Sequence, residues 1–267
     1  MKRKELQEMT LMDDIFMTAF FSEQTEVMEE VLRIILNKAD LEVVECHVQE
    51  VNENIYGRRS VMDVLGKDSK GRYYNIEVQK DMGEFPEERG ALNSAYLTVR
   101  HTLKGKGYEG IPETYVIIIT DRDPYGAGKK CYHVERKIEE LDDRKYKDKQ
   151  HIIYVNGSYR EEDAMGKLMA DFHESESKKI NNPVIRERMR RIKETEGGER
   201  QMSEWMEAHY HEDFVRAYKD GEMKGKAESA QNLMKQLHLS AEEAMEILDI
   251  GPEDKHRILA EIIDQKD

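Results

Sequence analysis

The sequence is poor in cysteine and lacks a long apolar run. Only Cys46 and Cys131 occur among the 267 residues, and both lie in apolar, strand-like stretches. Because their spacing matches no metal-binding or redox motif, we expect reduced thiols. No stretch approaches the roughly 18 consecutive apolar residues of a membrane span, and no apolar segment of a secretion signal follows the charged residues 1–5. We therefore expect a cytoplasmic protein without a membrane partner.

Basic residues are outnumbered by acidic ones, with 42 Lys or Arg against 56 Asp or Glu. The formal net charge is −14, which argues against nucleic-acid binding by the surface as a whole. The distribution is uneven, however, because residues 56–107 contain ten Lys or Arg and seven Asp or Glu, a local balance of +3. This region is therefore compatible with contacts to backbone phosphates, while the acidic excess lies elsewhere.

Residues 60–80 have the pattern of a β-hairpin that carries polar side chains on one face. The second strand, residues 72–80, alternates polar and apolar side chains with the period of a strand. Residues 67–71 between the strands supply turn-forming side chains and a glycine, Gly71, able to adopt positive φ. If the hairpin closes symmetrically about residue 70, Asp63 lies opposite Glu77.

Two opposed acids indicate a metal site. Directly opposed residues on neighbouring strands share a face, with Cβ atoms about 4.5–5.5 Å apart, and like charges at that distance destabilise the sheet unless a cation lies between them. A hard cation such as Mg²⁺ takes carboxylate oxygens. An open antiparallel sheet whose polar side chains face water gives the same alternation. Asp63 nevertheless lies inside the apolar run 62–65, where a charge is costly.

These residues resemble a known family. Asp63 and the later run from Asn75 to Gln79 are similar to the core of the PD-(D/E)XK nuclease family transposases, also called recombination-promoting nucleases. The likeness covers nearly the whole chain. It includes residues 12–16, 88–96, 106–108, 114–120, 153–157, 199–202 and 221–226.

The resemblance implies Mg²⁺-dependent (or Mn²⁺-dependent) cleavage of DNA phosphodiester bonds. Asp63 and Glu77 match the two metal-ligating acids, and Asp14 matches an acidic position that often adds a further ligand. Gln79 stands where the family name expects Lys. Its amide is able to orient an attacking water, but it cannot stabilise the transition state as a cation would. Asp63, Glu77 and Gln79 are therefore the catalytic candidates.

Three arginines are candidates for contact with DNA. Arg89 begins the helical run that must cross back over the sheet, where it would contact a phosphate or an acidic ligand. A structural ion pair with Glu77 or Glu84 is the other interpretation of Arg89, and the sequence leaves both open. Arg58 and Arg59 precede the first strand of the hairpin in the locally basic region.

The order of the expected elements indicates an α/β fold. The strand–helix–strand connection from residue 77 to residue 116 is typical of a crossover between parallel strands. We therefore predict a restriction-endonuclease-like α/β/α sandwich with a central mixed sheet and a C-terminal helical extension. The expected helices are 12–37, 86–103 and 161–173, and the expected strands are 41–51, the hairpin 60–80, 116–119, 129–135 and 151–155.

The chain is expected to divide into three parts. Residues 1–182 form the nuclease-like core, 183–225 a charged helical linker, and 226–267 a small helical module. Ser240 and Glu243 have the spacing of a capping box, which predicts a helix over 240–248. We expect this module to be a tethered appendage or an element through which the chain forms a homo-oligomer.

Two functions follow from these expectations. The first is a Mg²⁺-dependent DNA endonuclease linked to recombination or transposition. The alternative is a catalytically inactive relative that acts as a nucleic-acid-binding or protein-binding module through the same fold.

Overall fold

The computed structural model describes residues 3–53, 59–80, 86–102, 105, 107–205, 230, 234 and 240–248. The chain divides into two compact units, Met1–Glu204 and Trp205–Asp267. Within the described ranges, no helix has the length and apolar character needed to cross a membrane.

The first unit is built on a six-stranded mixed sheet. Its strand order is β1-β2-β3-β4-β8-β5, in which β3, β4 and β8 are parallel and the other neighbours are antiparallel. The strands are β1 (Val43–Glu53), β2 (Arg59–Asp68), β3 (Tyr73–Gln79), β4 (Thr114–Thr120), β5 (Cys131–Val134) and β8 (Gln150–Asn156). Two further short strands, β6 (Lys137–Ile138) and β7 (Arg144–Lys145), pair in a separate small sheet. The predicted mixed sheet is therefore confirmed.

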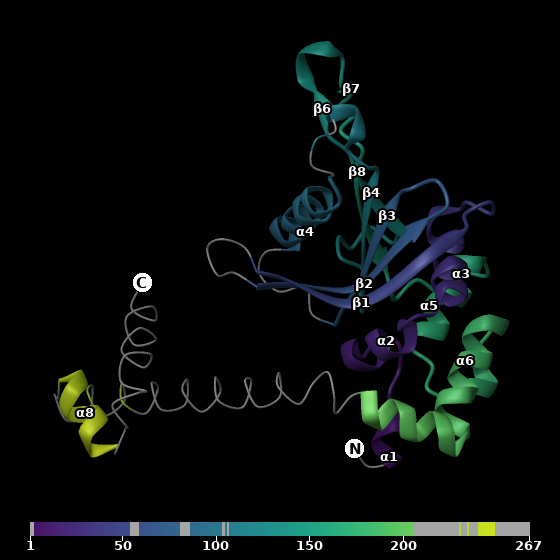
Figure 1. Ribbon diagram of the computed structural model, residues 1–267, viewed down its shortest axis with the longest axis vertical. Coiled ribbons are helices and arrows are strands. Elements are labelled where there is room, and N and C mark those ends of the chain that lie inside the picture. The colour runs from purple at the N-terminus through teal and green to yellow at the C-terminus, as the bar shows by residue number, and fades with distance from the viewer. Residues whose placement is uncertain are drawn as a thin grey trace. The chain divides into compact units, whose positions relative to one another are not determined.

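Helices cover both faces of this sheet. Helix α4 lies on one face, and α2, α3 and α5 lie toward the other (Figure 1). The helices of this unit are α1 (Arg3–Glu8), α2 (Asp14–Phe21), α3 (Thr25–Leu36), α4 (Pro86–His101), α5 (Ala164–Phe172) and α6 (Pro183–Glu194), with short 3₁₀ turns at Tyr108–Gly110, Glu139–Leu141 and Ser177–Lys179. This is the predicted α/β/α arrangement.

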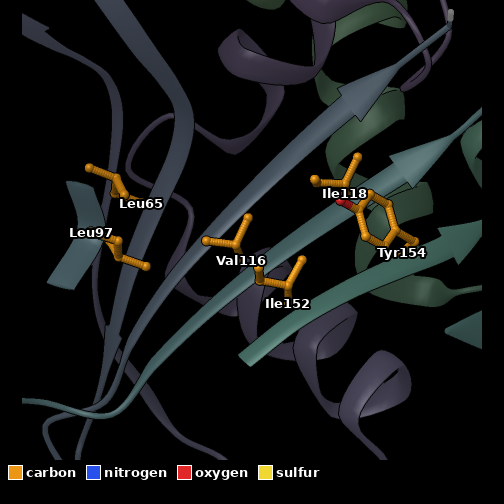
Figure 2. Close-up of a cluster of buried hydrophobic side chains, with 6 residues drawn as sticks. All are labelled: Leu65, Leu97, Val116, Ile118, Ile152 and Tyr154. Atoms are coloured by element: carbon orange, nitrogen blue, oxygen red, sulfur yellow. The ribbon is translucent and has the colours of Figure 1, made fainter. Parts of the chain in front are cut away.

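An apolar cluster fixes α4 on the sheet. Leu97 of α4 packs over buried side chains from three strands, β2, β4 and β8, which Figure 2 shows together. These side chains are Leu65, Val116, Ile118, Ile152 and Tyr154. Gly90 permits a close approach, because a Cβ atom there would collide with the hydroxyl of Tyr154. The helix is thus held at a defined height above β4 and β8.

The single helix expected over residues 12–37 was wrong. Helix α2 ends at Phe21 and α3 begins at Thr25, with Glu23 between them at a φ of 57°. The apolar pattern does not reveal this break, since it continues on both sides of it. Helix α2 buries nearly all of its residues, whereas α3 buries one stripe.

Residues 183–204 belong to the first unit. The side chain of Asn182 caps α6 by accepting hydrogen bonds from the backbone N–H groups of Val184 and Ile185 at 2.9 and 3.2 Å, and Pro183 occupies the first turn. Ile185 is one of the apolar side chains of α6 that are buried. The first compact unit accordingly extends to Glu204, and the boundary after residue 182 stays a prediction.

The second unit contains the helix predicted at its capping box. Helix α8 (Ala241–Ile247) begins after Ser240. The Glu243 carboxylate accepts a hydrogen bond from the Ser240 backbone N–H at 2.8 Å, and the Ser240 hydroxyl accepts one from the Glu243 N–H at 3.2 Å. The capping box is therefore confirmed. The sequence pattern also predicts a second short amphipathic helix at residues 253–264, which lies outside the described residues. The role of this module in oligomerisation stays a prediction.

Candidate active site

Glu77 lies in the middle of β3 and is completely buried, with 0% of its surface exposed. It belongs to a row of paired residues that continues through Ile118 in β4 to Tyr154 in β8, beneath α4. Its Oε1 accepts hydrogen bonds from the side-chain amides of Asn75, at 2.9 Å, and Asn93. Its Oε2 has no hydrogen-bond partner among the described residues. A buried carboxylate with one unbonded oxygen destabilises the fold unless another group binds that oxygen.

Arg89 provides a positive charge beside Glu77. Its Nε lies 3.6 Å from Oε2 of Glu77, and its side chain is 51% exposed. Arg89 and Asn93 are four residues apart on α4, so they share the helix face that meets β3. Of the two interpretations that the sequence left open, the ion pair with Glu77 is present in the structure. A contact between Arg89 and DNA stays a prediction.

Asp14, the first residue of α2, brings a second carboxylate toward Glu77. The preceding residue, Asp13, accepts a hydrogen bond from the backbone N–H of Thr10 at 2.8 Å and forms an ion pair with Lys80. Because Lys80 directly follows β3, this ion pair ties the start of α2 to the end of that strand. The start of α2 is thereby held beside the strand that carries Glu77.

The two carboxylates influence each other. Burial raises the pKa of Glu77, the Asn75 hydrogen bond and the Arg89 charge lower it, and the Asp14 charge raises it, with an upward net shift. Asp14 is exposed as a residue, yet loss of water around its carboxyl group raises its pKa, against the lowering effect of Arg89. Among the described residues, one half-exposed guanidinium therefore serves two carboxylates, which leaves this part of the site short of positive charge.

The observed pairing between β2 and β3 ends one residue short of Asp63 and Glu77. The pairs observed between β2 and β3 are Val64 with Ile76, Leu65 with Asn75, Gly66 with Tyr74, and Lys67 with Tyr73. Continued by one residue, this register would set Asp63 opposite Glu77, so their opposition stays a prediction. The side chains of Asp63 and Arg59 lie outside the described part of the chain, as does the whole of Arg58. Among the side chains that are described, no group of three or more His, Cys, Asp or Glu is arranged to hold a metal ion.

Gln79 ends β3 beside a cavity of about 440 Å³. The cavity lies where the parallel strands β3 and β4 end, the edge at which α/β sheets usually bind ligands. Its lining includes Lys80 and Arg122. Two acids in the lining are already bonded within the protein, since Asp121 contacts His173 at 3.1 Å and Asp123 accepts the Tyr132 hydroxyl at 2.6 Å.

Comparison with known proteins identifies the family. A family model described as PD-(D/E)XK nuclease family transposase matches residues 11–213. The chain belongs to this family. Its mixed six-stranded sheet with flanking helices is consistent with the restriction-endonuclease-like fold. No curated protein and no solved structure matches the chain.

Membership of the PD-(D/E)XK nuclease family suggests nuclease activity, and the structure adds two residues that the sequence did not reveal as part of the site. Asn75 lies on the same strand face as Glu77. The alternation of polar and apolar residues in this strand was the sequence signal that could have identified Asn75 as part of the site. Asn93 comes from α4 and is almost completely buried. Its spacing of four residues from Arg89 was the available signal, but only the packing of α4 shows that both side chains reach Glu77.

Proposed function

We propose that this chain is a metal-dependent DNA endonuclease that hydrolyses phosphodiester bonds with Mg²⁺ or Mn²⁺ and acts in DNA recombination or transposition. Family membership supports the reaction class. The single observation that carries the proposal is the buried, unbonded Oε2 of Glu77 in a site short of positive charge.

The donor set fits a hard divalent cation. Asp63, Glu77 and Asp14 would hold it through carboxylate oxygens, the ligands that Mg²⁺ prefers. In Glu77, the amide bonds occupy Oε1, so Oε2 is the oxygen left for a ligand role. When bound, such a cation polarises a phosphate oxygen and lowers the pKa of a coordinated water.

The remaining residues bind and orient the substrate. The amide of Gln79 orients the attacking water at the open end of β3. The half-exposed guanidinium of Arg89 presents hydrogen-bond donors to a phosphate next to the two acids. Arg122 is exposed and forms no ion pair with any described residue, so it is available to a phosphate of the DNA strand. Arg58 and Arg59 would extend the contact with DNA from the start of β2.

A plasmid-nicking assay tests the proposal. The wild-type protein is expected to nick supercoiled plasmid with Mg²⁺ or Mn²⁺ and to stop when a chelator is added. Asp63→Ala and Glu77→Ala should lose this activity. Glu187→Ala is the control, because Glu187 is an acid that pairs with Arg190 and Arg191 on α6. Equal nicking by all four proteins would contradict the proposal and point to another site or to a contaminant.

Substitution at Gln79 tests its role separately. Gln79→Lys is expected to retain or raise cleavage, since it adds the cation that the family pattern contains. Complete loss of metal binding in this variant would show instead that Gln79 is a ligand. A wild-type protein that binds DNA without nicking it under any of these conditions would support the alternative, a catalytically inactive nucleic-acid-binding relative.

A further inference from the structure

The hydrogen bonds of the Glu77 carboxylate are strongly asymmetric. The side-chain amides of Asn75 and Asn93 both donate to Oε1, the first at 2.9 Å. Oε2 is also buried and accepts no hydrogen bond from a described residue. Buried polar atoms in folded proteins are nearly always bonded, so an oxygen left open beside one that is bonded twice calls for an explanation.

Both amides are carried by rigidly placed elements. Asn75 precedes Glu77 by two residues on β3, so the two side chains share a face of the sheet. Asn93 is 3% exposed, and its location relative to Glu77 depends on where α4 lies on the sheet. That position is fixed by the packing of Leu97 in the apolar cluster and by the close approach of Gly90 to Tyr154. Two donors from two elements therefore fix the carboxylate plane and direct Oε2 away from the amides.

Arg89 makes only a long contact with Oε2 of Glu77. Its Nε is 3.6 Å from Oε2, which is too long for a hydrogen bond, and half of its side chain is in solvent. Because this contact is longer than a hydrogen bond and the Arg89 side chain is half in solvent, a divalent cation can replace the guanidinium at Oε2.

We infer that Asn93 is a positioning residue that, together with Asn75, holds Oε1 of Glu77 and so presents Oε2 to a divalent cation. This inference rests on the proposed function and deepens it, because it assigns a role to a residue that touches neither metal nor DNA. Groups that orient a metal ligand typically change metal affinity by about 10–100-fold when they are removed.

A purely structural role for Asn93 predicts a different outcome. In that case its amide only fastens α4 to β3, and its removal lowers the free energy of unfolding without changing metal affinity. Thr98 provides the matched control, since it is also a buried polar residue of α4, at 8% exposure. Its hydroxyl donates to the carbonyl of Ser94 at 2.9 Å and lies 3.2 Å from the hydroxyl of Thr114, away from Glu77.

The experiment measures Mn²⁺ binding by electron paramagnetic resonance in the full chain without DNA, so its readout is independent of cleavage. Wild type, Asn93→Ala and Thr98→Val are compared, with urea unfolding to measure the stability of each. We expect the Kd for Mn²⁺ to rise at least about tenfold in Asn93→Ala and to stay unchanged in Thr98→Val. Wild-type affinity in a folded Asn93→Ala protein would overturn the inference.

A second variant keeps the test decisive. If Asn93→Ala does not fold, Asn75→Ala removes the other donor to Oε1, and the same rise in Kd is expected. The two proposals fail in different ways. An unchanged Kd in these variants overturns only the positioning role, whereas a wild-type protein that binds no Mn²⁺ overturns the proposed metal-dependent function and the inference with it.

Discussion

Replacing Glu77 by Gln should stabilise the metal-free protein while removing its ability to bind metal. Gln has nearly the shape of Glu and keeps an oxygen that accepts the amide bonds from Asn75 and Asn93. It removes the negative charge from a completely buried position whose pKa is raised by burial and by Asp14. Stability and function are therefore expected to change in opposite directions at this residue.

The expected magnitude follows from two opposing contributions. An unbonded buried polar group costs about 1–3 kcal/mol, and more when it is charged. The pair with the half-exposed Arg89 offsets this by no more than about 1 kcal/mol. We therefore expect Glu77→Gln to raise the free energy of unfolding by about 1 kcal/mol in the absence of metal, which corresponds to about 2–4 °C in Tm for a unit of this size.

Urea unfolding with chelator and then with Mg²⁺ measures both effects. With chelator, Glu77→Gln should be more stable than wild type. Glu77→Ala should be less stable, because it leaves the amides of Asn75 and Asn93 without their acceptor. At a Mg²⁺ concentration 100 times Kd, only wild type should gain stability, by about 2.7 kcal/mol. A Glu77→Gln protein destabilised by more than about 1 kcal/mol in chelator would refute this reasoning. It would show instead that the ion pair between Arg89 and Glu77 stabilises the fold.

Three further predictions concern groups outside the metal site. Burial lowers the pKa of His101 from 6.5 to about 4, so the unfolded chain binds more protons between these pH values and the free energy of unfolding falls as pH drops from 6.5 to 4. His101→Phe, which can keep the stacking on Tyr73, should show a smaller fall in urea unfolding over this pH range, and an identical fall would contradict the prediction. Burial raises the pKa of Cys46 to about 11, so a thiol reagent at pH 8 should label Cys131 first and Cys46 only after unfolding, as mass spectrometry would show; equal rates would disprove it. Lys193 donates to three backbone carbonyls, so Lys193→Met should lower the free energy of unfolding by at least about 2 kcal/mol, and a Tm equal to that of wild type would contradict this.

The hairpin and the parallel core could be predicted because local patterns determine them. A period of two, a turn at residues 67–71 and one buried face leave a single register, and the four observed pairs, from Val64 with Ile76 to Lys67 with Tyr73, have the register of a hairpin that closes symmetrically about residue 70. The strand expected at residues 116–119 is likewise confirmed: its fully apolar run is typical of a central strand covered on both faces, and every residue of β4 is buried.

The rest of the site depends on packing between distant segments. Nothing in the local sequence states how closely α4 approaches the sheet, so the contact of Asn93 with Glu77 could not be predicted. The two interpretations of Arg89 stayed open for the same reason, since the choice depends on the distance between α4 and β3. The break at Glu23 was missed because the apolar pattern runs through it.

The most direct test of the central claim is calorimetric titration of Mg²⁺ into wild type, Asp63→Ala and Glu77→Ala. If acids from neighbouring strands share one cation, wild type should show saturable binding that disappears in both variants, while each variant keeps a cooperative unfolding transition. Binding of wild-type strength in either folded variant would contradict the account.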